Sequence, residues 1–313
     1  MSVAGAVPRE LRLLPFRGSD AVAAGLLTWA RLRSGSWRRL FPDVYVSSDL
    51  ALDHRLWCEA ALIYAGRTAG VPSVGRAAAR GAVPGVAVSG LSAAFLMGVD
   101  LLPLGGRPPE LTMPPSRRLR NPDLIVVRSP LAVSDIVTLS RLPVTAPERT
   151  AFDLACSLPF VEAVSAVDAL LNRRVVTHAA VRDFAKIAAP RPGSRRAVRA
   201  VEVADDGAES PMETRLRLCL VAAGLPRPET QVRVVSRDGV FIGRVDLAYR
   251  RQRVGLEYEG DHHRTRATFR QDIARINAMQ EAGWIIIRAT HDDIRNPATL
   301  IRQLRRLLAE RTP

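Results

Sequence analysis

The C-terminal third of the chain alternates strand-like and helix-like segments in an order that restricts the fold to a layered α/β arrangement. The segments are a helix at 210–225, strands at 229–235, 239–250 and 253–259, a helix at 267–281, a strand at 283–290 and a final helix from about Pro297. A hairpin closed by Asp-Gly, followed by a third strand, a helix and a further strand, is typical of a sheet covered by helices. The sequence therefore predicts an α/β (α+β) fold with a mixed sheet flanked by helices.

Acidic side chains are concentrated in two of these strands. Asp246 lies inside the run 239–250, and Glu257 and Glu259 alternate with apolar neighbours in the next run, so these two glutamates share one face of their strand. If the two runs pair as antiparallel neighbours, Asp246 lies close to Glu257. Two or three carboxylates then converge on one place in the sheet.

Such a group of carboxylates needs a cation, because like charges at short distance repel and otherwise take up protons. Clustered oxygen ligands suit Mg²⁺ or Mn²⁺, and a metal held in this way activates water for attack on a phosphodiester. We expect Asp246, Glu257 and His262 as metal ligands. His263 is the expected acid or base, and Glu259 is expected to assist through water.

Other interpretations of these residues remain open. The acids can instead form exposed ion pairs with the three arginines in 250–253. A zinc site is disfavoured, because no cysteine lies nearby and no second histidine lies one helical turn away. On the helix 267–281, Arg270 and Arg275 are expected phosphate contacts. Asp272 and Arg275, three residues apart, can instead form a solvated ion pair.

The charge balance points to a polyanionic partner. With 45 basic and 31 acidic residues the formal net charge is +14, of which residues 1–204 carry +10. A basic surface attracts phosphate backbones through counterion release and long-range steering. All basic residues except Lys186 are arginines, a bias that a GC-rich genome also produces, so the charge indicates nucleic acid only in combination with other features.

Residues 1–50 have the pattern of a small winged helix-turn-helix. A short helix, a turn at Gly25, a second helix to about Arg33 and a basic hairpin follow one another in 20–46. In such a module the second helix enters the major groove and the wing touches the backbone; a solvated basic helical hairpin is the alternative. The expected DNA contacts are Arg31, Arg33, Arg38 and Arg39.

The remaining boundaries follow from composition. Residues 51–187 are predicted to form an α/β middle domain, 188–208 a linker marked by proline and glycine, and 209–313 the mixed-sheet domain. A basic loop separates two strand-like runs of the middle domain, and it can contact phosphate or form a plain exposed turn. Its arginines are Arg117, Arg118 and Arg120.

Cysteine spacing and the N-terminal residues indicate in which cellular compartment the protein is expected. Cys58, Cys156 and Cys219 are far apart in apolar, helix-like segments, which favours buried thiols over disulfides or a zinc site. The N-terminus lacks the basic and apolar pattern of a signal peptide, and polar residues interrupt the most apolar stretch. We expect a cytoplasmic protein that does not span a membrane.

Residues 208–310 resemble the domain of unknown function allied to the very-short-patch repair endonucleases, within the PD-(D/E)xK nuclease superfamily. The resemblance is carried by Glu209 with SPMET, by VDLAY, LEYEGDHHR, FRQDIARINAMQEAGW and IIIRAT. It implies a metal site formed by the strand acids, with Glu213 entering from the first helix and His262 or His263 in the place of the repair enzymes' histidines. Glu259 stands where the superfamily has a lysine, so activation of water by an ammonium group is not available.

Glu213 also has a structural interpretation. Ser210 as N-cap, Pro211 in the first turn and Glu213 three residues after the cap form a capping box.

The N-terminal 200 residues resemble more loosely the AbiEi-type antitoxins, through RRLFPDVYV, VSGLSAAFLMG and VTAPERTAFDLA. This resemblance implies a winged-helix DNA-binding head, repression of the protein's own operon, and a cognate toxin or a second copy of the chain as partner.

These features predict a DNA-binding protein with a metal-dependent endonuclease domain that hydrolyses phosphodiester bonds. The alternative is a non-catalytic repressor or antitoxin whose nuclease-like domain has lost activity. An RNA-processing or purely structural role is a third interpretation, since RNA and DNA both present phosphates.

Overall fold

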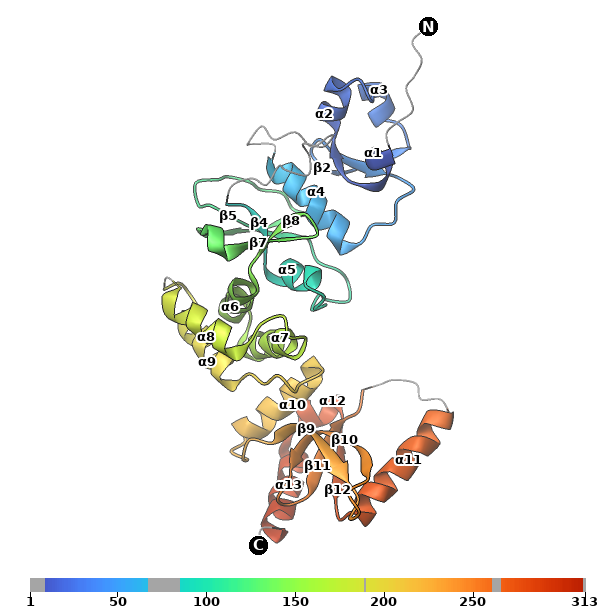
Figure 1. Cartoon of the computed structure of the whole chain (residues 1–313), viewed down its shortest axis with the longest axis vertical. Helices are drawn as coiled ribbons and strands as arrows, with labels where there is room; N and C mark the ends of the chain where they lie inside the picture. The colour runs from blue at the N-terminus through green and yellow to red at the C-terminus, as the bar shows by residue number, and fades with distance from the viewer. Residues whose placement is uncertain (1–8, 67–84, 189, 261–265, 312–313) are drawn as a thin grey trace. The chain divides into compact units, whose positions relative to one another are not determined.

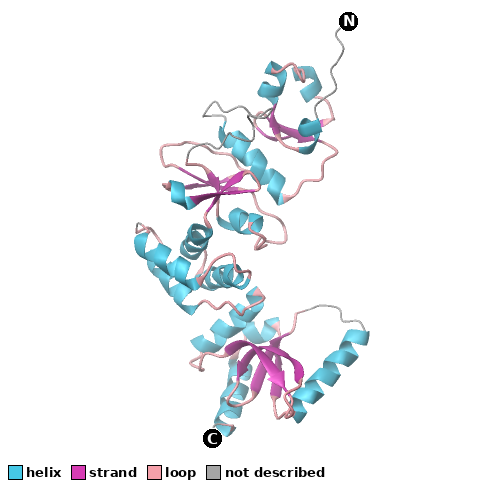
Figure 2. Cartoon of the chain, viewed as in Figure 1, coloured by secondary structure: helices cyan, strands magenta, loops and turns pink. Residues whose placement is uncertain are grey.

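The computed structural model describes residues 9–66, 85–188, 190–260 and 266–311 (Figure 1). The chain divides into two compact units, Met1–Leu154 and Ala155–Pro313. Helices and mixed sheets occur in both units (Figure 2), which confirms the predicted α/β class. No helix in the described ranges combines the length and the apolar character needed to cross a bilayer.

The first unit begins with three short helices and a three-stranded sheet of order β1-β3-β2. Its elements are α1 (Arg9–Leu13), β1 (Phe16–Arg17), α2 (Gly18–Ala23), α3 (Trp29–Leu32), β2 (Trp37–Phe41) and β3 (Val44–Ser47). Gly25 ends α2 with a φ of +70°, which only glycine adopts readily. Two helices are followed by a hairpin whose strand β3 also pairs with β1, and the winged helix-turn-helix expected for this region stays a prediction.

The head has its own small core. Phe16 packs edge-on against Trp37 at 5.1 Å between ring centroids and stacks on Tyr45 at 6.3 Å. Leu27 and Leu32 are buried with them, so the turn and α3 are held against the hairpin.

A five-stranded sheet of order β6-β5-β4-β8-β7 follows in the same unit. Its elements are α4 (His54–Gly66), β4 (Ala87–Val88), α5 (Gly90–Leu96), β5 (Glu110–Met113), β6 (Ile125–Arg128), a 3₁₀ turn (Val133–Asp135), β7 (Ile136–Leu139) and β8 (Leu142–Thr145). Strand β5 runs parallel to β6, and β4 runs parallel to β8, whereas the other pairs are antiparallel. The sheet is therefore mixed.

The second unit starts with helices, and its later part contains a four-stranded sheet of order β12-β11-β10-β9. Its helices are α7 (Phe160–Asn172), α8 (His178–Ile187), α9 (Ser194–Val203), α10 (Pro211–Ala222), α11 (Arg266–Glu281), α12 (His291–Arg295) and α13 (Ala298–Glu310). Its strands are β9 (Glu229–Val235), β10 (Phe241–Tyr249), β11 (Val254–Tyr258) and β12 (Ile285–Ala289). These bounds lie within a few residues of the predicted ones, because capping residues, the Asp-Gly turn and hydrophobic periodicity are local signals.

Helices cover both faces of this sheet (Figure 1). Leu247, Leu256 and Ile287 pack on one side with leucines of α10 and α13. Val245 and Ala248 pack on the other side with Met279 of α11. The sheet between them is mixed, since β11 runs parallel to β12 and antiparallel to β10.

The segment 188–208, predicted as a linker, contains helix α9. Ala197, Ala200 and Val201 of this helix are buried, and Arg196 donates to the carbonyl oxygen of Cys156 at 2.5 Å. The division between the two units instead lies within α6 (Pro147–Ser157). Proline and glycine at the ends of a segment mark turns, but they do not report whether the residues between them pack.

Candidate functional site

The strand register places Asp246 and Glu257 at the same level of neighbouring strands. Leu247 pairs with Leu256 in the antiparallel ladder of β10 and β11, which is the pairing that the expected site requires. The backbone N–H of Tyr258 donates to Asp246 Oδ2 at 2.9 Å. Asp246 is thus fixed against the end of β11.

Burial and the charges of nearby carboxylates both act on the pKa of Asp246. This pKa is raised from 3.8 to about 6, mainly by burial and to a smaller extent by the negative charges of Glu213, Glu257 and Glu209, while the hydrogen bond from Tyr258 lowers it. Within the described part of the chain, Asp246 has no ion pair. Asp246 of β10 thus lies within range of the negative charges of acids on α10 and β11, and the site expected from these residues stays a prediction.

Glu213 is positioned by the start of α10. Ser210 is the N-cap, and its Oγ accepts from the Glu213 N–H at 3.2 Å. Oε2 of Glu213 accepts from the backbone N–H of Glu209 at 3.0 Å and from Gln231 Nε2 at 2.9 Å. The predicted capping box requires the Glu213 carboxylate to accept from the N–H of the N-cap Ser210. In the structure it accepts from the N–H of Glu209, one residue earlier.

Gln231 was not among the expected site residues. It lies in β9 at the level of Asp246, with a φ of +50°, between the paired residues Thr230 and Val232. A glutamine in a strand carries no sequence signal of such a contact, because its link to Glu213 depends on how α10 packs on the sheet.

We expect Ser210→Ala to lower the free energy of unfolding by about 1 kcal/mol, because the first turn of α10 loses its side-chain acceptor. Urea unfolding followed by far-UV circular dichroism measures this loss. Ser210→Thr, which keeps an acceptor oxygen, is the control and is expected to stay close to wild type. Equal stability of all three proteins would contradict the capping role.

Glu257 is bound by a guanidinium. Arg275 of α11 donates from Nη1 to Glu257 Oε1 at 2.5 Å and from Nη2 to Oε2 at 2.9 Å, a two-bond fork. The same Nη2 reaches Asp272 Oδ1 at 2.6 Å, so the expected pair along α11 is present. The bond to Glu257 raises the pKa of Arg275 despite burial.

A second arginine extends this network. Arg288 of β12 is paired in register with Glu257, and its guanidinium contacts Asp272 and Glu259, the latter at 3.3 Å. Glu259, expected to assist through water, is therefore in contact with a cation of the protein itself. Arg275, expected to contact phosphate, directs its donors to Glu257 and Asp272.

The described residues do not fit a Mg²⁺ or Mn²⁺ site as they are arranged. Both oxygens of Glu257 are engaged by Arg275, and Oε2 of Glu213 accepts two hydrogen bonds. No group of three or more His, Cys, Asp or Glu side chains that could hold a metal ion occurs in the ranges that the structure describes. The expected ligand His262 and the expected acid or base His263 lie outside those ranges.

The expected DNA contacts in the head are exposed. Arg31 lies on α3, whose N-cap Thr28 accepts from the Arg31 N–H at 3.2 Å, and Arg33 follows the helix. Arg38 and Arg39 lie on β2, where Arg38 also donates to the carbonyl oxygen of residue 50 at 3.1 Å. Arg270 lies in α11, and its side chain is outside the described part.

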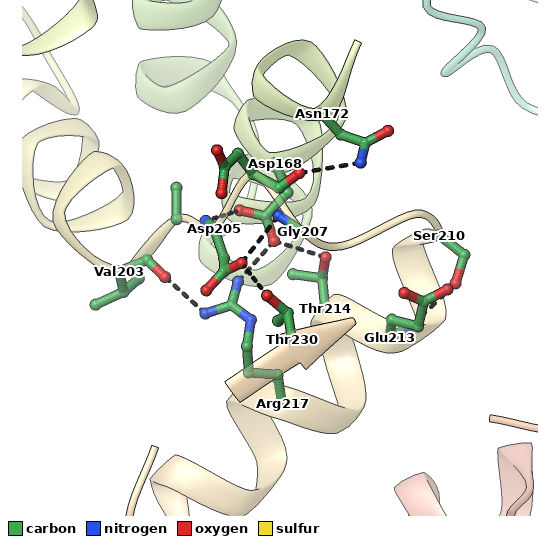
Figure 3. Close-up of polar contacts among 12 residues, drawn as sticks. Asp168, Asn172, Val203, Asp205, Gly207, Ser210, Glu213, Thr214, Arg217 and Thr230 are labelled. Atoms are coloured by element: carbon green, nitrogen blue, oxygen red, sulfur yellow. Dashed lines mark hydrogen bonds and ion pairs between the residues drawn. The ribbon is translucent and has the colours of Figure 1, made fainter. Parts of the chain in front are cut away.

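A buried polar network binds the N-terminal half of α10, the helix that carries Glu213 (Figure 3). Arg217 and Asp168 are each 1% exposed, and Arg217 Nη2 donates to Asp168 Oδ2 at 2.6 Å. Asp168 also accepts from the Thr214 hydroxyl at 2.8 Å and from the Asp205 N–H at 2.7 Å. Arg217 Nη1 donates to the carbonyl oxygen of residue 203 at 2.7 Å. The network joins α7, α9 and α10.

Asp205 continues the network to the sheet (Figure 3). Its Oδ1 accepts from the Thr230 hydroxyl at 2.6 Å and from the Gly207 N–H at 3.0 Å, and its Oδ2 accepts from Arg227 at 2.8 Å. Sequence reasoning missed these residues. The available signal was Asp168, an acid between the apolar residues Val167 and Ala169 of α7.

Comparisons with known proteins find relatives that are themselves uncharacterized. No family model matches the chain. Two uncharacterized proteins of Mycobacterium tuberculosis, from strain CDC 1551 / Oshkosh and strain ATCC 25618 / H37Rv, are each 32% identical over 166 residues, which is 52% of this chain and 61% of theirs. The chain thus spans about three fifths of the length of the curated relatives it matches.

Proposed function

We propose that this chain is a DNA-binding protein of the repressor or antitoxin type, whose C-terminal domain has the carboxylates of a nuclease fold but does not cut DNA. DNA binding is supported by the head, where α3 and the β2–β3 hairpin present exposed arginines in a winged-helix arrangement. The formal charge of +14 favours a phosphate backbone as the partner.

The fork between Arg275 and Glu257 carries the non-catalytic part of the proposal. A divalent metal requires free carboxylate oxygens, and this guanidinium occupies both oxygens of the acid that was the expected second ligand. Arg288 contacts one oxygen of Glu259 and one oxygen of Asp272. The protein thus supplies its own cations to most of the acidic cluster.

A metal-dependent endonuclease is the second candidate function, and Asp246 favours it. This carboxyl group has no guanidinium partner in the described part of the chain, and its pKa is raised to about 6 beside three other acids. Perturbed carboxyl groups of this kind are concentrated at functional sites. For this function Arg275 has to release Glu257.

Two measurements on the same protein separate these functions. Fluorescence anisotropy with duplex DNA from the protein's own promoter, at several salt concentrations, measures binding, and incubation of supercoiled and linear DNA with Mg²⁺ or Mn²⁺ measures cleavage. We expect salt-dependent binding without cleavage. Cleavage that Asp246→Ala abolishes would establish the endonuclease instead, and absence of binding would contradict both.

The head is tested by Arg38→Gln with Arg39→Gln. If both contact phosphates, the slope of log K against log salt becomes shallower by roughly 2, since each phosphate contact contributes about 0.9. The control replaces Arg182 and Arg295, two exposed arginines of the second unit, with Gln. An equal effect of both double variants would indicate attraction by net charge alone.

A further inference from the structure

The carboxyl ends of two parallel strands in the first unit meet at one edge of the five-stranded sheet. Strands β5 and β6 run parallel, and Met113 at the end of β5 is level with Arg128 at the end of β6. In open α/β sheets ligands bind outside the carboxyl ends of the strands, where the following loops face the same side. This edge is therefore a place to look for a binding site.

Arginines line a hollow at this edge. The hollow has a volume of about 590 Å³ and is lined by Pro115, Arg118, Arg120 and Arg128. An adjoining hollow of about 240 Å³ shares Arg118 and includes Arg117. Both lie in or beside the basic loop that the sequence offered as a phosphate contact or a plain turn.

The loop that carries these side chains is ordered by its own backbone bonds. The N–H of Arg117 donates to the carbonyl oxygen of Pro114 at 3.0 Å, and the N–H of Leu124 donates to that of Asn121 at 3.2 Å. Two turns thus bracket Arg118 and Arg120. Pro114 and Pro115 also restrict the backbone of this loop.

The charges in the hollow are not compensated by acids lining it. Arg118, Arg120 and Arg128 are exposed, and none of their side chains has an ion pair or hydrogen bond among the residues that the structure describes. Asp123 is the acid of the same loop, and it does not line the hollow. Three guanidinium groups around one hollow repel one another, so this arrangement gains from an anion.

The lining also indicates which anion. Guanidinium groups bind phosphate oxygens through paired hydrogen bonds. A site for a whole nucleotide requires an apolar or aromatic surface against which the base can pack, and none of the described residues that line the hollow is aromatic. The chemistry therefore suits phosphate groups without recognition of the base.

We infer that Arg118, Arg120 and Arg128 form a phosphate-binding site for the nucleic-acid backbone, separate from the winged-helix head. This inference rests on the proposed DNA-binding function and adds a sequence-independent contact to it. Phosphate contacts set the position and the salt dependence of binding, and base contacts set the sequence.

The test replaces all three arginines with Gln in the full chain and measures anisotropy with duplex DNA across a salt series. We expect the slope of log K against log salt to become shallower by about 2 to 3, with the same loss of affinity for specific and unrelated sequences. The matched control replaces Arg182, Arg237 and Arg295 with Gln, which removes the same charge from exposed positions of the second unit. Circular dichroism verifies that both variants fold.

Each outcome decides one question. If the triple variant and the control weaken binding equally while wild type binds DNA, the hollow is not a specific site and the proposed function stands. If wild type binds no DNA, the proposed function fails. Calorimetric titration of wild type and the triple variant with inorganic pyrophosphate then tests the hollow alone. If wild type releases binding heat and the triple variant does not, the hollow is a phosphate site for a ligand other than DNA. If both proteins give equal heats, the inference is overturned.

Discussion

Replacing Arg217 with methionine is expected to lower the free energy of unfolding of the second unit by roughly 3–5 kcal/mol. The substitution leaves the Asp168 carboxylate buried without its cation, while Thr214 and the Asp205 amide remain as donors. Burial already raises the pKa of Asp168, and Arg217 opposes this. Loss of the guanidinium therefore costs the full desolvation of a charge.

Urea unfolding of the full chain measures this loss, and Arg215→Met is the matched control. Arg215 lies on the same helix, but its pair with Glu162 is exposed, so its removal is expected to cost between about 0 and 1 kcal/mol. Adding Asp168→Asn to Arg217→Met is expected to recover part of the stability, because asparagine keeps an acceptor without the charge. A cost below about 1 kcal/mol for Arg217→Met would contradict a buried pair.

Replacing Asp246 with asparagine is expected to stabilise the protein by roughly 2–3 kcal/mol above pH 6. The pKa of this carboxyl group is about 6 in the folded protein and 3.8 without its surroundings. The folded state therefore binds the proton more tightly, and the stabilisation present below pH 4 is lost as the pH rises through 6. Asparagine carries no charge, so it avoids this loss and still accepts from the Tyr258 amide.

Unfolding measured between pH 4 and pH 8 gives the difference between wild type and Asp246→Asn at each pH. The difference is expected to be small at pH 4 and to grow up to about pH 7. Glu229→Gln, which removes an exposed carboxylate on β9, is the control and is expected to show no such trend. A constant difference across this range would mean that the pKa of Asp246 is not raised in the folded protein. This result does not depend on whether the protein cuts DNA.

Most elements of the second unit follow from local sequence signals. Ser210 with Pro211 marks the start of α10, and Gly239 with a φ of +80° closes the hairpin between β9 and β10. Since cap, turn and period-two alternation act over a few residues, the strands and their antiparallel pairing could be predicted. With the pairing, the approach of Asp246 to Glu257 followed as well.

The partners of these acids could not be predicted. Arg275 is 18 residues from Glu257, and Arg217 is 49 residues from Asp168, in a chain with 44 arginines. Which guanidinium reaches which carboxylate depends on how α11 packs on the sheet and how α7 packs on α10. A long flexible side chain gives no periodic signal of its partner.

The sequence by itself determined the α/β class and the order and bounds of the helices and strands in the second unit. Only the tertiary structure decided that Arg275 and Arg288 pair with neighbouring acids while Asp246 has neither as a partner. It also placed Arg128 beside Arg118 and Arg120. The physical reason is that local structure depends on near neighbours, whereas compensation of buried or clustered charge depends on which distant side chains the packing brings within reach.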